Sequence, residues 1–261
     1  MTTKKEILQW YLESGVTETI GEVPMNRFHS VETQSLLKET PITPTPLIIP
    51  QEQTFPSDSL LQTAVQSASK AETCEQLLEA LNTFDGCSLK KTANSTIFGE
   101  GVEKPDILFI GEAPGADEDR LGRPFVGKSG LLLDKIMSAV GLSREKNAYI
   151  TNIIPWRPPG NRSPSDIEIS LCLPFLRRHI ELLQPKIIVL LGGVALSAVV
   201  GKGETITRSR GIWQNYETPQ TGAPIPLMAV FHPAFLLRNP AQKKWVWHDM
   251  LLVAQKLKEV S

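Results

Sequence analysis

The chain has 261 residues, of which 41% are hydrophobic and 21% charged, a balance typical of a folded globular protein that buries its own core. Its longest apolar stretch, residues 187–200, is interrupted by Gly192, Gly193 and Ser197 and falls short of the roughly 18 to 20 apolar residues that a membrane-spanning helix needs. This excludes a membrane protein. Because the first residues lack the apolar core of a secretory signal, we expect a cytoplasmic protein.

The distribution of charge and the cysteine content narrow the classes of function further. Residues 1–83 carry five Lys and Arg against eleven Asp and Glu, whereas residues 84–261 carry 22 against 17. A basic C-terminal body suits a partner that bears phosphates, although a small excess spread over so many residues is also common among soluble enzymes. The three cysteines, Cys74, Cys87 and Cys172, contain no CxxC pair, so we expect reduced thiols and neither a disulfide framework nor a zinc site.

The first part of the chain is expected to stand apart from the folded body. Residues 4–14 have apolar side chains at helical spacing and predict a short helix. Five prolines follow between residues 41 and 56, and because proline lacks a backbone donor and fixes an extended geometry, they predict an exposed linker. We therefore divide the chain into residues 1–58, an N-terminal helix with a flexible Pro-rich linker, and residues 59–261, the folded domain. An acidic segment on such a linker can tether a protein partner, and it can equally be disordered without one.

The rest of the sequence alternates between helical patterns and short apolar runs. Leucines and alanines at helical spacing predict a helix at residues 59–81. After Cys87, runs of strand length are predicted at residues 106–110, 148–154, 186–191 and 226–231, with helices at 128–140, 164–183, 195–199 and 241–260. This alternation predicts an α/β fold with a mostly parallel central sheet.

Polar segments follow three of the four predicted strands, at residues 111–119, 151–159 and 232–240. Taken alone, each is explained by an ordinary turn, since glycine and proline are common after strands. The carboxyl ends of parallel strands meet at one edge of a sheet, however, so a carboxylate cluster, an amide, an imidazole and the nearby ring of Phe125 would face one crevice. Such a convergence of groups is what a pocket for a nucleic-acid base requires.

These motifs resemble those of the uracil-DNA glycosylase superfamily, closest to its family-4 type. The resemblance covers residues 86–257 and rests on GEAPG at 111–115 with Glu118 and Asp119, GRPFVG at 122–127, TN at 151–152, RPPGNR at 157–162 and HPAFLLR at 232–238. It implies a three-layer α/β/α fold with a central, mostly parallel four-stranded sheet. It also implies a monofunctional DNA N-glycosylase of base-excision repair, which hydrolyses the N-glycosidic bond of deoxyuridine, releases uracil and leaves an abasic site.

The same resemblance implies an iron–sulfur cluster on four cysteines, and here the chain departs from the family pattern. Cys87 and Cys172 match the second and fourth ligands, whereas the first and third positions fall on Phe84 and Trp156. Two thiolates are too few for the usual four-cysteine ligation. We therefore expect no cofactor and no bound metal, with Phe84 and Trp156 packed where the inorganic core would sit.

The resemblance further implies how the site residues act once a nucleotide has been extruded from the DNA, a step that chemistry on a base requires. Glu112 lies in the motif that positions water and sugar, Glu118 or Asp119 share the electrostatic work, and which carboxylate dominates stays open. His232 donates to the negative charge that develops on uracil O2. Uracil is bound by backbone groups around Ala113, stacked on Phe125 and identified by the carboxamide of Asn152, which matches the N3–H and O4 edge of the base.

DNA is expected to contact the segment that follows His232. Phe235, Leu236 and Leu237 suit a wedge that fills the gap left by the extruded nucleotide, with Arg238 placed for a phosphate, although the three apolar side chains can equally just pack the loop. Further phosphate candidates are Arg157, Arg162, Lys128, Arg208 and Arg210. The expected partner is uracil-containing DNA, single- or double-stranded, bound by a monomer without membrane association.

Two alternatives stay open beside this interpretation. One is a uracil-DNA-binding module with weak or no catalysis, against which the joint presence of Glu112, Asn152 and His232 argues. The other is a nucleotide-binding, Rossmann-like enzyme that acts on small molecules. The sequence has no GxGxxG motif after the first predicted strand, which argues against this alternative. The alternative also leaves the Pro-rich loop around Arg157 unexplained.

Overall fold

The computed structural model describes residues 58–217 and 223–260. The helix predicted at residues 4–14 and the Pro-rich linker lie outside the described residues. Within the described ranges, none of the helices has the length and apolarity to cross a membrane.

A sheet with the strand order β1-β3-β2-β4-β6-β5 forms the centre of the described chain. Its four inner strands are parallel and confirm the four predicted ones: β2 (Ile107–Gly111), β3 (Ala148–Asn152), β4 (Ile187–Leu191) and β6 (Ile225–Val230). The prediction of a four-stranded sheet missed two antiparallel edge strands, β1 (Glu100–Gly101) beside β3 and β5 (Trp213–Tyr216) beside β6. Both are too short, and too exposed, to give a clear apolar pattern.

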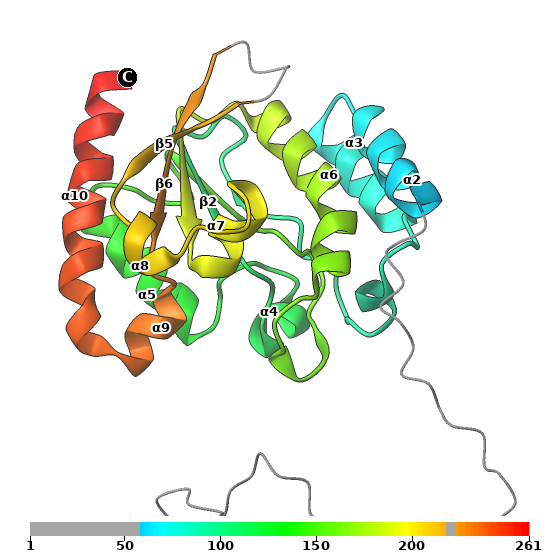
Figure 1. Ribbon diagram of the computed structural model, residues 1–261, viewed down its shortest axis with the longest axis horizontal. Helices are drawn as coiled ribbons and strands as arrows, with labels where there is room; N and C mark the ends of the chain where they lie inside the picture. The colour runs from blue at the N-terminus through cyan, green and yellow to red at the C-terminus, as the bar shows by residue number, and fades with distance from the viewer. Residues whose placement is uncertain (1–57, 218–222, 261) are drawn as a thin grey trace, which may run out of the picture. The chain divides into compact units, whose positions relative to one another are not determined.

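Helices cover both faces of this sheet, because the side chains of its inner strands alternate between two cores. Leu108 and Ile110 of β2 join a core with α2 (Asp58–Ser69), α3 (Cys74–Thr83), α6 (Asp166–Leu183) and α7 (Gly193–Val199). Ile107 and Phe109 point the other way, to a core with α5 (Lys128–Ser138) and α10 (Lys243–Val260). Figure 1 shows α6 and α10 on opposite sides of the sheet. The predicted three-layer α/β/α fold is confirmed.

The single helix predicted at residues 59–81 is wrong in one respect, since the chain forms two helices there. The break falls between Ser69 and Cys74 because Thr73 caps α3, with its Oγ1 accepting a hydrogen bond from the Gln76 amide at 3.3 Å. The remaining helical segments are short: α4 (Ala116–Leu121), α8 (Ile206–Ser209) and α9 (Pro233–Arg238), with 3-10 turns η1 (Ser88–Lys91), η2 (Pro159–Asn161) and η3 (Pro240–Gln242).

Candidate active site

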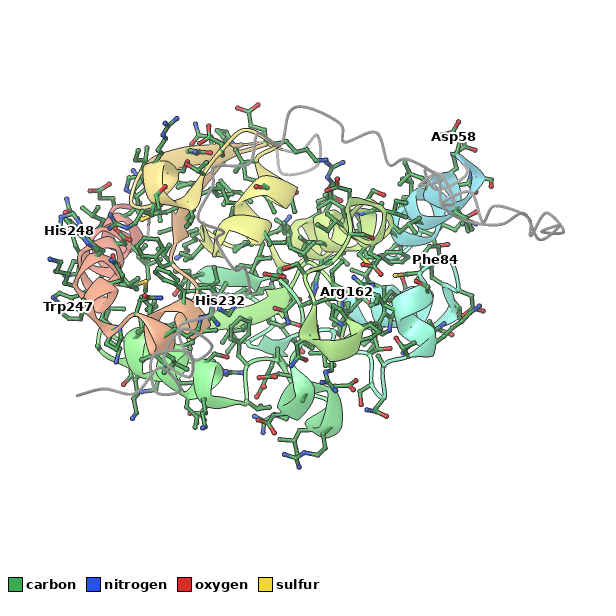
Figure 2. The ribbon with its side chains drawn as sticks, turned by 60° about the horizontal axis from the view of Figure 1, so that its bottom comes forward. Asp58, Phe84, Arg162, His232, Trp247 and His248 are labelled. Atoms are coloured by element: carbon green, nitrogen blue, oxygen red, sulfur yellow. The ribbon has the colours of Figure 1, made fainter. Side chains whose placement is uncertain are left out.

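A cavity of about 460 Å³ opens where the parallel strands end. In the sheet, β2 lies between β3 and β4, so the chain first continues to one side of β2 and later returns to its other side. This reversal opens a crevice at the carboxyl ends of the strands, which is the usual place for a ligand in an open α/β fold. Figure 2 shows His232 and Arg162, from segments far apart in the chain, on the side turned toward the viewer. The predicted site residues that line the cavity are Glu112, Ala113, Glu118, Phe125, Asn152, Arg162, His232, Phe235 and Arg238.

Asn152 ends β3 and lines the cavity with a side chain whose buried acceptor is unsatisfied in the described part of the chain. The residue is only 5% exposed, and its Oδ1 is buried without a hydrogen-bond partner in the described part of the chain. A buried oxygen in this state costs free energy unless a ligand supplies a donor. Gly111 lies opposite in the register of β2, and a Cβ there would come within 2.4 Å of Asn152 Oδ1 and 2.5 Å of the Phe125 ring. Glycine at this position therefore makes room for both side chains.

The rings of Phe125 and His232 form another part of the cavity lining. Their centroids are 5.7 Å apart and their planes are tilted by 33°. Phe125 has a left-handed backbone, with φ at 52°, which is unusual for a residue with a side chain. Gly192 approaches His232 from the end of β4, and a Cβ there would lie 3.0 Å from the Cβ of His232.

His232 is fixed in one protonation state by its surroundings. Burial, assisted by the positive charge of Arg238, lowers the pKa of the imidazole to about 4, so the ring is neutral at pH 7. Its Nδ1 accepts a hydrogen bond from the Ala234 amide at 3.1 Å, which makes His232 the N-cap of α9. The single proton of the neutral ring therefore resides on Nε2, and His232 can donate one hydrogen bond from that atom.

The three predicted carboxylates have different surroundings. Glu112 follows β2 and lines the cavity; burial raises the pKa of its carboxyl group, and a hydrogen bond with Ser163 opposes the shift. Glu118 also lines the cavity, but its Oε1 accepts from the amides of Val126 and Gly127, each at 2.9 Å, and its Oε2 accepts from Gly115 at 3.1 Å. Of the two, Glu112 is the one without backbone donors in the described residues.

Asp119 does not line the cavity. Its carboxylate accepts hydrogen bonds from the Asn94 amide at 2.8 Å, the Asn94 side chain at 2.6 Å and the Ser95 amide at 3.2 Å. These contacts join α4 to the segment that precedes β1. Asp119 is thus placed to order the loops around the cavity and not to meet a ligand.

The predicted DNA contacts divide into accessible and inaccessible side chains. Leu237 is 43% exposed, whereas Leu236 is fully buried in the core beside α5 and α10. The prediction that Leu236 belongs to a wedge is therefore wrong, because the helical turn of α9 directs it inward. The suggestion of Arg210 as a phosphate contact is also wrong, since its guanidinium is paired with the buried carboxylate of Asp249.

The two arginines of the loop after β3 are both partnered. Arg162 lines the cavity and donates to both carboxylate oxygens of the buried Glu168, at 2.8 and 2.6 Å. Arg157 lies outside the cavity lining and donates to Asn161 Oδ1 at 2.8 Å. Their side chains are thereby oriented on the rim of the site.

Comparisons with known proteins agree with this geometry. The family model of the Uracil DNA glycosylase superfamily matches residues 98–251. The chain belongs to the uracil-DNA glycosylase superfamily. It is 38% identical to the type-4 uracil-DNA glycosylase of Archaeoglobus fulgidus over 173 residues, which are 65% of this chain and 85% of that protein. It is 38% identical to the type-4 enzyme of Thermotoga maritima (66% and 86% covered) and 37% identical to that of Pyrobaculum aerophilum (68% and 91% covered).

The four positions that the resemblance assigned to cluster ligands do not provide four thiolates, because two of them are Phe84 and Trp156. Cys87 and Cys172 are both buried, and the interaction of the two thiols together with burial raises the pKa of Cys172 well above its usual range. Phe84 packs on Phe175 with ring centroids 5.2 Å apart. In the described ranges, no group of three or more His, Cys, Asp or Glu side chains could hold a metal ion. The donors present thus do not fit a four-cysteine cluster.

Trp156 occupies the remaining ligand position as a fully buried side chain. Its Nε1 donates to Thr96 Oγ1 at 3.1 Å, so its one polar atom is satisfied within the core. Phe84, Cys87, Trp156 and Cys172 belong to one continuous hydrophobic core.

Two contributors to this uracil-DNA glycosylase site were missed in the sequence. Ser163 bonds to the Glu112 carboxylate from the loop after β3, and Gly111 provides the space for Asn152 and Phe125. Gly111 was quoted only as part of the GEAPG motif, without this role, and Ser163 directly follows the RPPGNR motif and not a strand. Neither residue type is distinctive enough to be selected without the fold.

Proposed function

We propose that Glu112, Phe125, Asn152 and His232 act together on a single deoxyuridine extruded from DNA into the cavity. Membership of the superfamily makes the protein a uracil-DNA glycosylase, a DNA N-glycosylase that hydrolyses the bond between uracil and deoxyribose in base-excision repair. The observation that carries the proposed division of roles is the buried Oδ1 of Asn152, which has no partner among the described residues and belongs to a side chain that lines the same cavity as the other three.

Recognition of the base is assigned to Asn152 and Phe125. The Oδ1 of Asn152 accepts from N3–H of uracil and its amide donates to O4, whereas cytosine presents the opposite pattern and would leave buried groups unpaired. The Phe125 ring stacks on the base, a contact worth about 1 to 3 kcal/mol and insensitive to base identity. Backbone groups around Ala113 bind the remaining edge of the base.

Bond cleavage is assigned to His232 and Glu112. As the bond between C1′ and N1 breaks, negative charge develops on uracil O2 and positive charge on the sugar. The Nε2–H of neutral His232 donates to O2, while the Glu112 carboxylate stabilises the sugar cation and orients the water that adds to C1′. Glu118 and Asp119 support the reaction indirectly. Glu118 orders the loops that carry Gly115 and Val126, and Asp119 orders the segment that carries Asn94.

The DNA surface surrounds the mouth of the cavity. Arg238, Arg162 and Arg157 are proposed to contact phosphates of single- or double-stranded uracil-containing DNA, and Phe235 and Leu237 to fill the space that the nucleotide leaves. Because all lining residues come from residues 112–238 of one chain, a monomer of the domain at residues 59–261 suffices. Residues 1–58 are proposed to serve a protein partner, on the strength of their acidic, Pro-rich composition.

We also propose that the enzyme works without an iron–sulfur cluster. Support comes from the donor set, in which Phe84 and Trp156 stand at two of the four ligand positions. Iron and sulfide analysis of anaerobically purified protein tests this directly. An iron content near zero is expected, and a four-iron content would overturn the proposal.

Uracil release from a defined oligonucleotide tests the enzymatic role. The purified protein is expected to release free uracil and to leave a strand that breaks only on treatment with alkali, since a monofunctional enzyme leaves the abasic site intact. Binding to uracil DNA without release would instead identify a uracil-DNA-binding module.

A further inference from the structure

The loop that carries Phe125 is bonded from behind by a single arginine. Arg144 lies in the connection between α5 and β3, and its side chain is only 11% exposed. Its Nη1 donates to the carbonyl oxygen of Pro124 and its Nη2 to that of Phe125, both at 2.6 Å. The guanidinium is itself oriented by Asp134, at 2.9 Å from Nε, and by Glu100, at 3.2 Å from Nη1.

The backbone of Phe125 requires such support. A left-handed conformation with φ at 52° is unfavourable for any residue with a Cβ, so neighbouring contacts must maintain it. Gly130 in the first turn of α5 packs on the same carbonyl so closely that a Cβ there would lie 1.8 Å from the Phe125 oxygen. The Phe125 carbonyl is thus enclosed between Gly130 and Arg144, and this fixes the direction of the aromatic ring.

Behind the loop that carries Phe125 there is open space, so the hydrogen bonds from Arg144 are needed to hold this loop in place. A second cavity, of about 540 Å³, is lined by Arg144, Glu100, Asp134 and Phe125. Phe125 also lines the first cavity and so forms a wall between the two. Packing alone does not prevent such a wall from shifting away from a bound base, because the space behind it is open.

We infer that Arg144 is a positioning residue for base stacking: its guanidinium fixes the left-handed backbone of Phe125 so that the ring stands ready against the extruded base. The inference rests on the proposed stacking role of Phe125. Arginine suits the task because its planar fork donates to two neighbouring carbonyls at once, which the single ammonium group of lysine does not reproduce.

A double-mutant cycle with Arg144→Ala and Phe125→Ala tests the inference, with the single-turnover rate of uracil release by the full chain as the readout. Each single variant is expected to slow release by about tenfold or more. In the Phe125→Ala background, Arg144→Ala is expected to add less than about a twofold loss, because the ring on which it acts is gone. Arg144→Lys is expected to recover only part of the rate that Arg144→Ala loses. If Arg144→Ala does not fold, Arg144→Lys takes its place in the cycle.

Arg178→Ala is the matched control. Arg178 is also a partly buried arginine that donates to a backbone carbonyl, that of Ala71 at 2.8 Å, and pairs with a carboxylate, Glu181, but it lies outside the cavity lining. Its loss is expected to lower the melting temperature without changing the single-turnover rate at a temperature where the protein is folded.

Two results would overturn the inference, and they are distinguishable. If Arg144→Ala slows release by the same factor with and without the Phe125 ring, Arg144 gives only general support, while the proposed function stands. If Phe125→Ala releases uracil at the normal rate, the stacking role fails, and the inference fails with it.

Discussion

Asn152 is the residue whose surroundings most directly predict a function, because its buried acceptor has no partner among the residues that the structure describes and needs a donor from a ligand. Replacing it by aspartate removes the donor to O4 and places a charge beside a base that becomes anionic. We expect the variant to lose about 10- to 100-fold in kcat/KM on uracil DNA, the equivalent of one buried hydrogen bond, and to discriminate less against cytosine. Asn215→Asp, which adds the same charge at an exposed position of β5 outside the cavity lining, is the control. Unchanged rate and selectivity of Asn152→Asp would contradict the assignment.

His232 is expected to act as a neutral donor throughout the physiological range. With a pKa of about 4, its ring does not titrate near neutrality. The single-turnover rate should therefore show no histidine titration between about pH 6 and about pH 8, and His232→Ala should lower the rate by about 10² to 10³. His248→Ala, on the exposed face of α10, serves as the control. A near-normal rate for His232→Ala would remove the residue from the site.

Within α9, two adjacent leucines are expected to behave differently because the helix directs them to opposite environments. Leu236→Ala should lower the free energy of unfolding by about 2 to 5 kcal/mol, since Leu236 is fully buried. Leu237→Ala should leave the free energy of unfolding unchanged. It should weaken binding to double-stranded uracil DNA more than binding to single-stranded uracil DNA, because only a duplex has a gap to fill when the nucleotide leaves. Urea denaturation and binding titrations separate the two effects. Equal loss of stability in both variants would show that Leu237 merely packs the loop.

The sequence predicted the elements whose signal is local and missed those that depend on distant partners. The four parallel strands were recognisable because each is a run of apolar residues buried on both faces, and the site followed from the polar residues at their ends. The break at Thr73 was hidden by apolar residues that continue on both sides of it. Leu236 was misassigned because a wedge and a helix core have the same composition over six residues. Arg210 was misassigned and Arg144 was not singled out, since the partners that orient their side chains lie far away in the sequence.

For the protein as a whole, two histidines with lowered pKa values, the buried His179 and the half-buried His232, predict sensitivity to acid. Burial lowers the pKa of His179 to about 3 and that of His232 to about 4, from the ordinary value of 6.5. Between the folded and the unfolded pKa values, the unfolded chain binds protons that the folded chain does not. The free energy of unfolding that these histidines affect is therefore at its full value above pH 6.5 and falls as the pH drops toward 4. Each histidine contributes a slope of about 1.4 kcal/mol per pH unit.

Replacement of His179 isolates one part of this acid sensitivity. His179 is stacked on Phe98, with ring centroids 4.0 Å apart, so phenylalanine is a fitting substitute. Urea denaturation at a series of pH values should show a shallower loss of stability for His179→Phe than for the unsubstituted protein. An unchanged slope would show that His179 does not titrate in this way.

The measurement that tests the account most directly is single-turnover release of uracil from one single-stranded oligonucleotide, compared for the full chain and its Glu112→Gln, Phe125→Ala, Asn152→Asp and His232→Ala variants. If these four side chains enclose one extruded base, the unsubstituted enzyme releases uracil and each variant is slowed by at least about tenfold, while all of them stay folded. Normal rates in the variants, or no uracil from the unsubstituted enzyme, would contradict the account.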